Sequence, residues 1–239
     1  MSNHAVLDPA AHRDLRVHAE AGVELGDGVM ACITVPTEFR RVQNEFPILF
    51  RRDLESGNFS ALALMGFENG ENLFLDERGW DAAYRPMGLA IQPFLVGRSE
   101  SGEGPAQVHI DLAHPRIAGA GEGIGLFDDI GQPTPYLENV AAMLEELDAG
   151  YRASPDFFKA LERHELIEPL AVDVQLNDGS QHRLVGYHIV NEDRLVSLEG
   201  EALEELHRAG HLMPIFMALA SLSNLAKLAR RKNQRLGLG

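Results

Sequence analysis

Two side chains of the kind that bind iron in oxygenases stand two positions apart near the middle of the chain. His109 and Asp111 lie in a segment predicted to be a strand, where alternation places both on one face. A later histidine, His182 or His188, would complete the two-histidine, one-carboxylate set that holds Fe(II). Arg194 would then bind the carboxylate of a 2-oxoacid. One hypothesis is therefore an Fe(II)- and 2-oxoglutarate-dependent oxygenase with a jelly-roll core and a His109, Asp111, His188 triad.

The same residues have a structural interpretation. An H-x-D pattern arises easily in a chain with 10 histidines, and a half-exposed strand can simply present a solvated His and Asp. His114, and His207 with His211 one helical turn further on, are interpreted as surface histidines because no third ligand accompanies them. Both interpretations of His109 and Asp111 stay open at this point.

Nucleophilic and nucleotide chemistry have weaker signals. The sequence has no Gly-x-Ser-x-Gly, and Cys32 lies in an apolar segment, which favours a buried small residue over a reactive thiolate. The glycine-rich residues 118–125 lack the Lys-Ser/Thr ending of a phosphate-binding loop and are interpreted as a chain reversal. Acidic pairs such as Glu145 with Glu146 are interpreted as solvated surface.

The amino-acid composition limits the classes of binding partner that we expect. The 239 residues carry 21 Lys and Arg against 36 Asp and Glu, a net charge of −15 with neutral histidines. A negative field of this size disfavours nucleic acid and anionic lipid. The single cysteine excludes an internal disulfide and fits a reducing compartment. Because no signal peptide is visible at the N-terminus, we expect a cytoplasmic protein.

The central stretch, residues 58–96, supplies the candidate binding residues. Its aromatic and charged insert contains Trp80, Tyr84 and Arg85, whose polar tips we expect at the surface over a core. Together with Asp111 they are the predicted binding residues, and the ligand is an unknown small molecule or protein. An exposed apolar surface around Trp80 would favour a homodimer.

The elements that must position these residues follow from local patterns. Closely spaced apolar runs with turn signals between them predict antiparallel strands. The predicted strands are 29–35, 47–50, 59–65, 73–75, 88–96 with Pro93 at an edge or bulge, 106–112, 170–176 and 182–190. Start signals at Thr134-Pro135 and at Ser154-Pro155 predict two successive helices, the first ending before Gly150.

Two further helices are predicted at the C-terminus, over residues 200–209 and from Met213 onward. The second carries only Lys227 as a charge over residues 213–229, yet its Ser, Asn and Pro residues make it a poor membrane span. We therefore expect it to dock on the core. The basic residues that follow complement the negative end of the helix dipole.

With these residues laid out, the chain resembles the SapC family of bacterial proteins over nearly all of its length. The resemblance rests on the order and spacing of short motifs: His12 with Leu15–Val17, Glu38-Phe39, Phe46–Phe50, Asn72–Asp76, Tyr84–Pro86, Pro93-Phe94, Ile110-Asp111, Leu126-Phe127 with Gly131 and Pro133, Leu184–Tyr187, and Leu219–Leu222. The family's name comes from an association with surface-layer proteins, and it implies no defined activity. Asp111 belongs to the family pattern, whereas His109 is not typical of it, which weakens the iron triad.

These observations predict an α+β fold. We expect an N-terminal arm, residues 1–27, and a single domain, residues 28–239, with a mainly antiparallel sheet from 28–112 and 170–190. Helices over 134–164 and 200–232 should back this sheet. The leading hypothesis is a SapC-like accessory protein without a cofactor, which acts by binding in the handling of surface polymers or peptides. The metal-dependent oxygenase is the alternative.

Overall fold

The structure, a computed structural model, describes residues 3–97 and 106–238. The chain groups into two compact units. The first comprises Met1–Gly28, Leu75–Asp81 and Met87–Ala149, and the second comprises Val29–Phe74, Ala82–Pro86 and Gly150–Gly239. Residues 3–27 of the expected arm are part of the first unit. The single domain from residue 28 onward stays a prediction.

The first unit is built on a three-stranded antiparallel sheet. Its strands, in spatial order, are β1 (His4–Val6), β9 (Gln107–Asp111) and β8 (Phe94–Gly97). Pro93 directly precedes β8, an edge strand, as its missing N–H predicts. Most of the predicted strand 88–96 is wrong, because residues Met87–Ala90 form a helical turn, α2, closed by the Ile91 N–H on the Met87 carbonyl.

Smaller elements complete the first unit. They are the two-stranded pairs β2 (Arg16–Val17) with β10 (Ile124–Gly125) and β6 (Leu75–Asp76) with β7 (Gly79–Trp80), and a π-helical turn, η1 (Val23–Asp27). The core of this unit is formed by apolar residues from β2, β8, β9, α3 and the segments between elements: Val17, Ile91, Phe94, Ile110, Leu126, Leu137, Val140 and Leu144. The last three recur at three- and four-residue spacing and therefore share one face of helix α3 (Pro135–Arg163).

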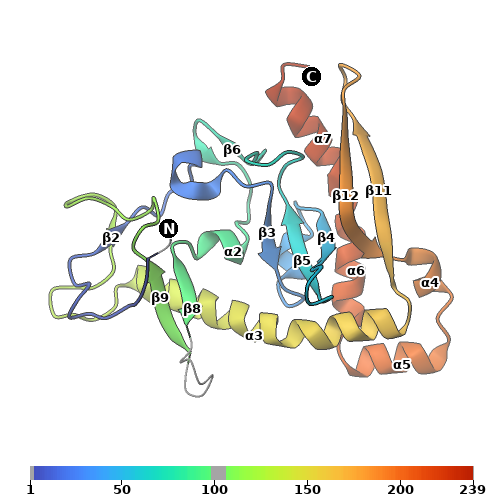
Figure 1. Ribbon diagram of the computed structural model, residues 1–239, viewed down its shortest axis with the longest axis horizontal. Helices are drawn as coiled ribbons and strands as arrows, with labels where there is room; N and C mark the ends of the chain where they lie inside the picture. The colour runs from blue at the N-terminus through green and yellow to red at the C-terminus, as the bar shows by residue number, and fades with distance from the viewer. Residues whose placement is uncertain (1–2, 98–105, 239) are drawn as a thin grey trace. The chain divides into compact units, whose positions relative to one another are not determined.

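The second unit contains the largest sheet. Its five strands, in spatial order, are β11 (Ile167–Gln175), β12 (Gln181–Val190), β4 (Ile48–Arg52), β5 (Phe59–Leu64) and β3 (Ala31–Thr34). All neighbours are antiparallel. The β11–β12 hairpin is the long pair of strands beside α7 in Figure 1, and it turns between the two predicted strands 170–176 and 182–190, with Gly179 at φ 84°.

The expected single sheet is thus divided, since β8 and β9 pair with β1 while the earlier strands join the C-terminal hairpin. The order of the five-stranded sheet differs from an eight-stranded jelly roll. The α+β class with mainly antiparallel strands is confirmed, and alternation along a strand could not say which neighbour it would pair with.

The second unit also contains most of the helices. Besides the second half of α3 they are α1 (Phe39–Val42), α4 (Glu192–Val196), α5 (Gly200–Arg208), α6 (Leu212–Ser221) and α7 (Asn224–Arg235). Helix α6 contacts α1, β4 and β12. Two buried polar residues, one in α6 and one in α7, fix these helices to neighbouring segments. The Ile48 N–H donates to Ser221 Oγ (2.8 Å), and Asn224 Nδ2 donates to the Gln43 carbonyl (2.7 Å).

Residues Leu212–Arg235 are also long and apolar enough, by length and composition, to cross a membrane. In the structure this run is divided into α6 and α7, and one face is buried through Ile215, Ala218, Ser221 and Leu228. The docking predicted from the spacing of apolar residues is confirmed.

Helix α3 differs from the prediction of two helices. It continues through Gly150 and Pro155 as a single 29-residue helix. Proline lacks the N–H that would bond the Tyr151 carbonyl, and beside it Ser154 Oγ donates to the Gly150 carbonyl (2.8 Å). The backbone of Gly150 lies close to Val35 and Thr37, where a Cβ would come within 2.5 Å of Val35 Cγ2. Packing against α3 therefore overrides the local stop signals.

Candidate functional site: a polar groove beside the five-stranded sheet

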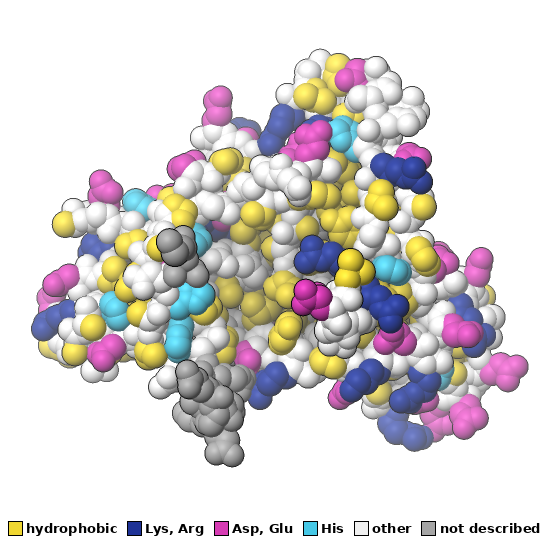
Figure 2. Space-filling view, viewed as in Figure 1, with side chains coloured by type: hydrophobic (Ala, Val, Ile, Leu, Met, Phe, Trp, Pro, Cys, Tyr) yellow, Lys and Arg dark blue, Asp and Glu magenta, His cyan; other side chains and the backbone are white. Residues whose placement is uncertain are grey.

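The candidate site lies within the second unit, beside β3, β5 and the second half of α3. It is a groove of about 320 Å³, called the polar groove here. Its lining combines an apolar floor with ionisable and hydroxyl groups: Ile33, Thr34, Asp53, Ser56, Asn58, Phe59, Ser60, Ala61, Tyr151, Ser154, Pro155, Phe158, Lys159 and Glu162. Figure 2 shows acidic and basic side chains interspersed on the face of the second unit that is in view.

The β4–β5 turn positions the first carboxylate. Asp53 Oδ1 accepts hydrogen bonds from the Ser56 N–H and hydroxyl (both 2.7 Å), and Gly57 supplies the positive φ of 74° that the turn needs. The Ser56 N–H, and then its hydroxyl, lower the pKa of Asp53. Asp53 is therefore ionised at neutral pH and suits the binding of a cation or a hydrogen-bond donor better than general acid catalysis.

Helix α3 supplies the opposite wall. Tyr151, Ser154, Phe158 and Glu162 recur at three- and four-residue spacing and therefore share one helix face. The Tyr151 side chain is 59% exposed, so its ring is available to a ligand. Glu162 lies 4.0 Å from Arg52. An exposed ion pair this long contributes little to stability, which leaves the carboxylate able to change partners.

A buried carboxylate, that of Glu38, is hydrogen-bonded to a residue that lines the groove and has a structural role. Glu38 is 0% exposed and accepts hydrogen bonds from Thr34 Oγ1 and the Tyr84 hydroxyl (both 2.7 Å). Burial, and then the negative charge of Glu38, raise the pKa of the nearby Cys32 thiol. Cys32 therefore stays protonated, which fits its interpretation as a small residue of the strand rather than a nucleophile.

The three residues of the iron hypothesis each have local neighbours. The His109 ring lies over Gly97, where a Cβ would come within 1.9 Å of His109 Nε2. Asp111 Oδ1 accepts hydrogen bonds from the N–H groups of Asn3 (2.8 Å) and Ala113 (3.0 Å), which lower its pKa. These contacts make Asp111 a cap for the ends of β1 and β9.

His188 packs its ring edge-on against Phe59, with centroids 5.1 Å apart. Burial, and then the charge of Arg52, lower the pKa of His188. In residues 3–97 and 106–238, no group of three or more His, Cys, Asp or Glu side chains is arranged to hold a metal ion. The iron triad stays a hypothesis.

The predicted binding residues fall in different units. Trp80 lies in β7 of the first unit and is half-buried, whereas Tyr84 and Arg85 belong to the second. The Tyr84 hydroxyl is engaged with Glu38, and the Tyr84 ring carries the Arg41 guanidinium 5.4 Å from its centroid. Asp111 caps strands in the first unit. That these four residues bind a ligand stays a prediction.

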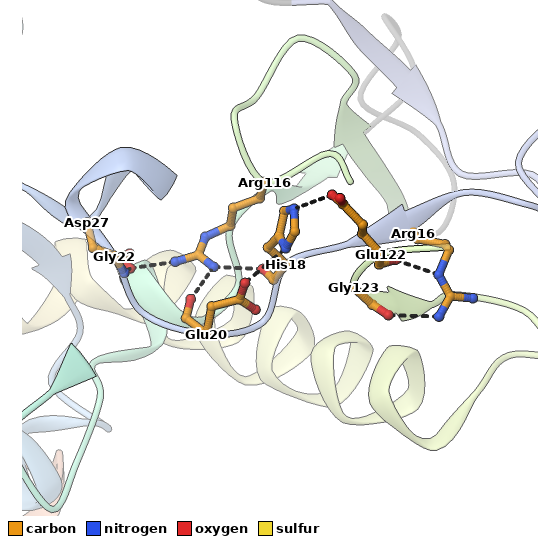
Figure 3. A network of polar contacts seen from close by, with 8 residues as sticks. All are labelled: Arg16, His18, Glu20, Gly22, Asp27, Arg116, Glu122 and Gly123. Carbon is orange, nitrogen blue, oxygen red and sulfur yellow. Dashed lines mark hydrogen bonds and ion pairs between the residues drawn. The ribbon is translucent and has the colours of Figure 1, made fainter. Parts of the chain in front are cut away.

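A second polar constellation lies in the first unit and holds the N-terminal segment (Figure 3). The Arg116 guanidinium donates to Asp27 Oδ2 (2.6 Å) and to the carbonyls of His18 and Glu20 (both 2.7 Å). Arg116 and Asp27 are each 1% exposed. Removing one member of a buried pair leaves an uncompensated charge, at a cost of about 3–5 kcal/mol. We assign this pair to the fold, since it joins η1 and β2 to the segment after β9.

Sequence reasoning missed the polar groove. Ser154 was interpreted only as a helix start, and Asp53, Ser56 and Asn58 gave no signal of a binding site. The signal that could have found the groove is the i, i+3, i+7 series Tyr151, Ser154, Phe158, which carries an aromatic ring and a hydroxyl on one face beside the apolar face of α3. That series does not show which strand it meets.

The chain was compared with family models, curated proteins and solved structures. The model of the SapC family matches residues 7–228, nearly the whole chain, as the motif order predicted. No curated protein and no solved structure matches the chain.

Proposed function

Since the chain belongs to the SapC family, we propose that it is an accessory protein that acts by binding, and that the polar groove takes an extended peptide segment of a cell-surface polymer. The link to the cell surface follows the association from which the family takes its name. The observation that carries the proposal is the lining of the polar groove, in which an aromatic and aliphatic floor is edged by groups of both charges.

A peptide matches this lining group by group. Its apolar side chains can pack on Phe59 and Tyr151, and its backbone amides can bond the hydroxyls and the Asn58 amide. A basic side chain can pair with Asp53, and an acidic one with Lys159, which lies 3.9 Å from Asp156 in a weak surface pair. Because the net charge of −15 disfavours polyanions, we expect the selected peptides to be neutral or basic.

The experiment selects binders from a phage-displayed library of random peptides and measures the best by calorimetry. We expect Tyr151→Ser to weaken binding about tenfold, because exposed tyrosines at binding sites lose packing on both ring faces when truncated. Phe216→Ser is the matched control, since Phe216 is a similarly exposed aromatic, 53% against 59%, outside the groove.

Charge is tested by a second pair of variants. Lys159→Gln should weaken a few-fold those selected peptides that carry an acidic side chain, whereas Lys227→Gln on α7 should change nothing. The proposal is wrong if selected peptides bind equally to wild type and Tyr151→Ser. Retention of an oligosaccharide on a glycan array, lost in Tyr151→Ser, would replace the peptide by a glycan at the same groove.

A further inference from the structure

A second groove lies on another face of the second half of α3, within the second unit. It has a volume of about 370 Å³ and is called the methionine groove here. Gly150, Ala153 and Phe157 face it from α3, whereas Tyr151, Ser154 and Phe158 face the polar groove. One helix therefore separates two cavities whose linings share no residue, and a ligand of one need not touch the other.

The methionine groove is lined mainly by apolar side chains that can adapt to a ligand. Met213 and Met217 come from α6, with Pro36 and Phe157 opposite them. Met213 is 54% exposed, which is high for an apolar side chain beside a cavity. Unbranched methionine side chains change rotamer at low cost and suit a flexible aliphatic chain.

One cation stands among this apolar lining. Arg40 is exposed, and its guanidinium has no hydrogen-bond or ion-pair partner in the described part of the chain. The other titratable lining group is His211, which packs against Phe157 with ring centroids 5.5 Å apart. Burial lowers the pKa of His211, so it is neutral at pH 7. The carboxylates of Asp156 and Glu205 lie near His211. The negative charge around the groove is therefore beside His211, and the positive charge of the lining is at Arg40.

We propose that the methionine groove binds a medium-chain fatty acid, with the aliphatic chain along Met213 and Met217 and the carboxylate on Arg40. The volume falls within the range of pockets that enclose small molecules, about 300–1,000 Å³. A planar guanidinium binds a carboxylate through two parallel hydrogen bonds. A single cation in a chain of net charge −15 favours a monoanion over a polyphosphate or an anionic bilayer.

Calorimetry with decanoate and with decanol, both kept below their aggregation limits, tests the proposal on the full chain. Wild type should bind decanoate more tightly than decanol. Arg40→Gln should weaken decanoate about three- to tenfold and leave decanol unchanged, because only the carboxylate uses the guanidinium. Arg230→Gln, the same change on α7, should affect neither ligand.

Ala153→Trp tests the location. Ala153 is exposed on α3, so the larger side chain fills the groove rather than the core, and binding of both ligands should be lost. Circular dichroism checks that the variant is folded. The inference is overturned if decanoate binds the Ala153→Trp variant as it binds wild type, if decanoate and decanol bind alike, or if neither binds. Tyr151→Ser should leave decanoate binding unchanged, so this test is independent of the peptide proposal.

Discussion

The two grooves on either side of α3 show how one helix can carry two different surfaces. The polar groove combines Asp53, Lys159 and Glu162 with an exposed tyrosine, while the methionine groove carries Arg40 on an apolar lining. The difference arises from a rotation of about 100° per residue, which sends neighbours such as Ala153 and Ser154 to different sides. Polar and apolar residues therefore alternate along the sequence of α3, and the helix places them on different faces.

The largest expected effect compares a threonine from each groove. Thr34→Val removes a donor from the buried Glu38 and should lower the free energy of unfolding by about 1.5–3 kcal/mol, the range for hydrogen bonds to charged groups. Thr37→Val, at an exposed position of the methionine groove, should change it by less than about 0.5 kcal/mol. Urea denaturation of both variants measures the difference. Equal effects would show that the floor of the polar groove does not depend on this bond.

The next effect concerns the helix that separates the grooves. Gly150→Ala places a Cβ within 2.5 Å of Val35 Cγ2 and 2.7 Å of Thr37 Oγ1. Overpacking costs about 1–3 kcal/mol, against a gain of up to about 1 kcal/mol in helix propensity. We expect a net loss of roughly 1–2 kcal/mol in thermal or urea unfolding. Gly200→Ala is the control, because no atom lies within 4 Å of its Cβ, and a loss there as large would refute the packing argument.

A smaller effect concerns the hydroxyl beside Pro155. Ser154→Ala removes the hydrogen bond to the Gly150 carbonyl and should destabilise the protein by about 0.5–1.5 kcal/mol, as for a neutral bond. Ser223→Ala, which removes a similar bond to the Ala220 carbonyl at an exposed position, is the matched control and should cost less. Denaturant titration of the two variants compares them. A stabilised Ser154→Ala would indicate that the bond instead bends α3 at a cost.

The smallest expected effect is on the pH dependence of stability. It compares His211 of the methionine groove with Asp53 of the polar groove. The pKa of His211 is lowered below 6.5, mainly by burial, so between that value and its folded pKa the unfolded chain binds more protons. Its contribution to stability is present above about pH 6.5 and is lost as the pH falls through this window. Asp53 has a lowered pKa and stays ionised there.

Unfolding free energies at pH 7.5 and pH 5.5 measure this dependence. We expect wild type to lose stability at the lower pH, and His211→Gln to lose less. His207→Gln, an exposed histidine of α5, is the control and should keep the wild-type slope. Stability that rises on acidification would contradict the expected direction of the pH dependence. If His211→Gln keeps the wild-type slope, the pH dependence would instead arise from His114 or His188, whose pKa values are also lowered by burial.

Much of the fold followed from local patterns, and the failures have identifiable causes. The β11–β12 hairpin was predictable because its Asn177–Gly179 turn fixes both strands, and α6 because its apolar residues recur at helical spacing. Residues 88–96 were mistaken for one strand because a short apolar run fits a helical turn equally well. Proline and serine at 154–155 signal a helix start, yet α3 passes through them because packing compensates one lost hydrogen bond.

The site was harder to predict than the fold. His109 and Asp111 attracted a chemical interpretation by type and spacing, but their neighbours are Gly97 and the N–H groups of Asn3 and Ala113. Asp53 and Tyr151 lie nearly a hundred positions apart along the chain and gave no joint signal, although both line the polar groove. Such groupings depend on which strand and helix meet.

The amino-acid sequence by itself determined the α+β class, the family, the positions of most turns and the apolar faces of α3 and α6, because these depend on residues within a few turns of one another. Tertiary structure alone decided which strands share a sheet, that Arg116 and Asp27 are buried together, and that α3 borders two unlike grooves. The physical reason is range. Hydrogen-bonding preference and periodicity act between near neighbours, whereas a groove exists only where distant segments pack and leave space between them.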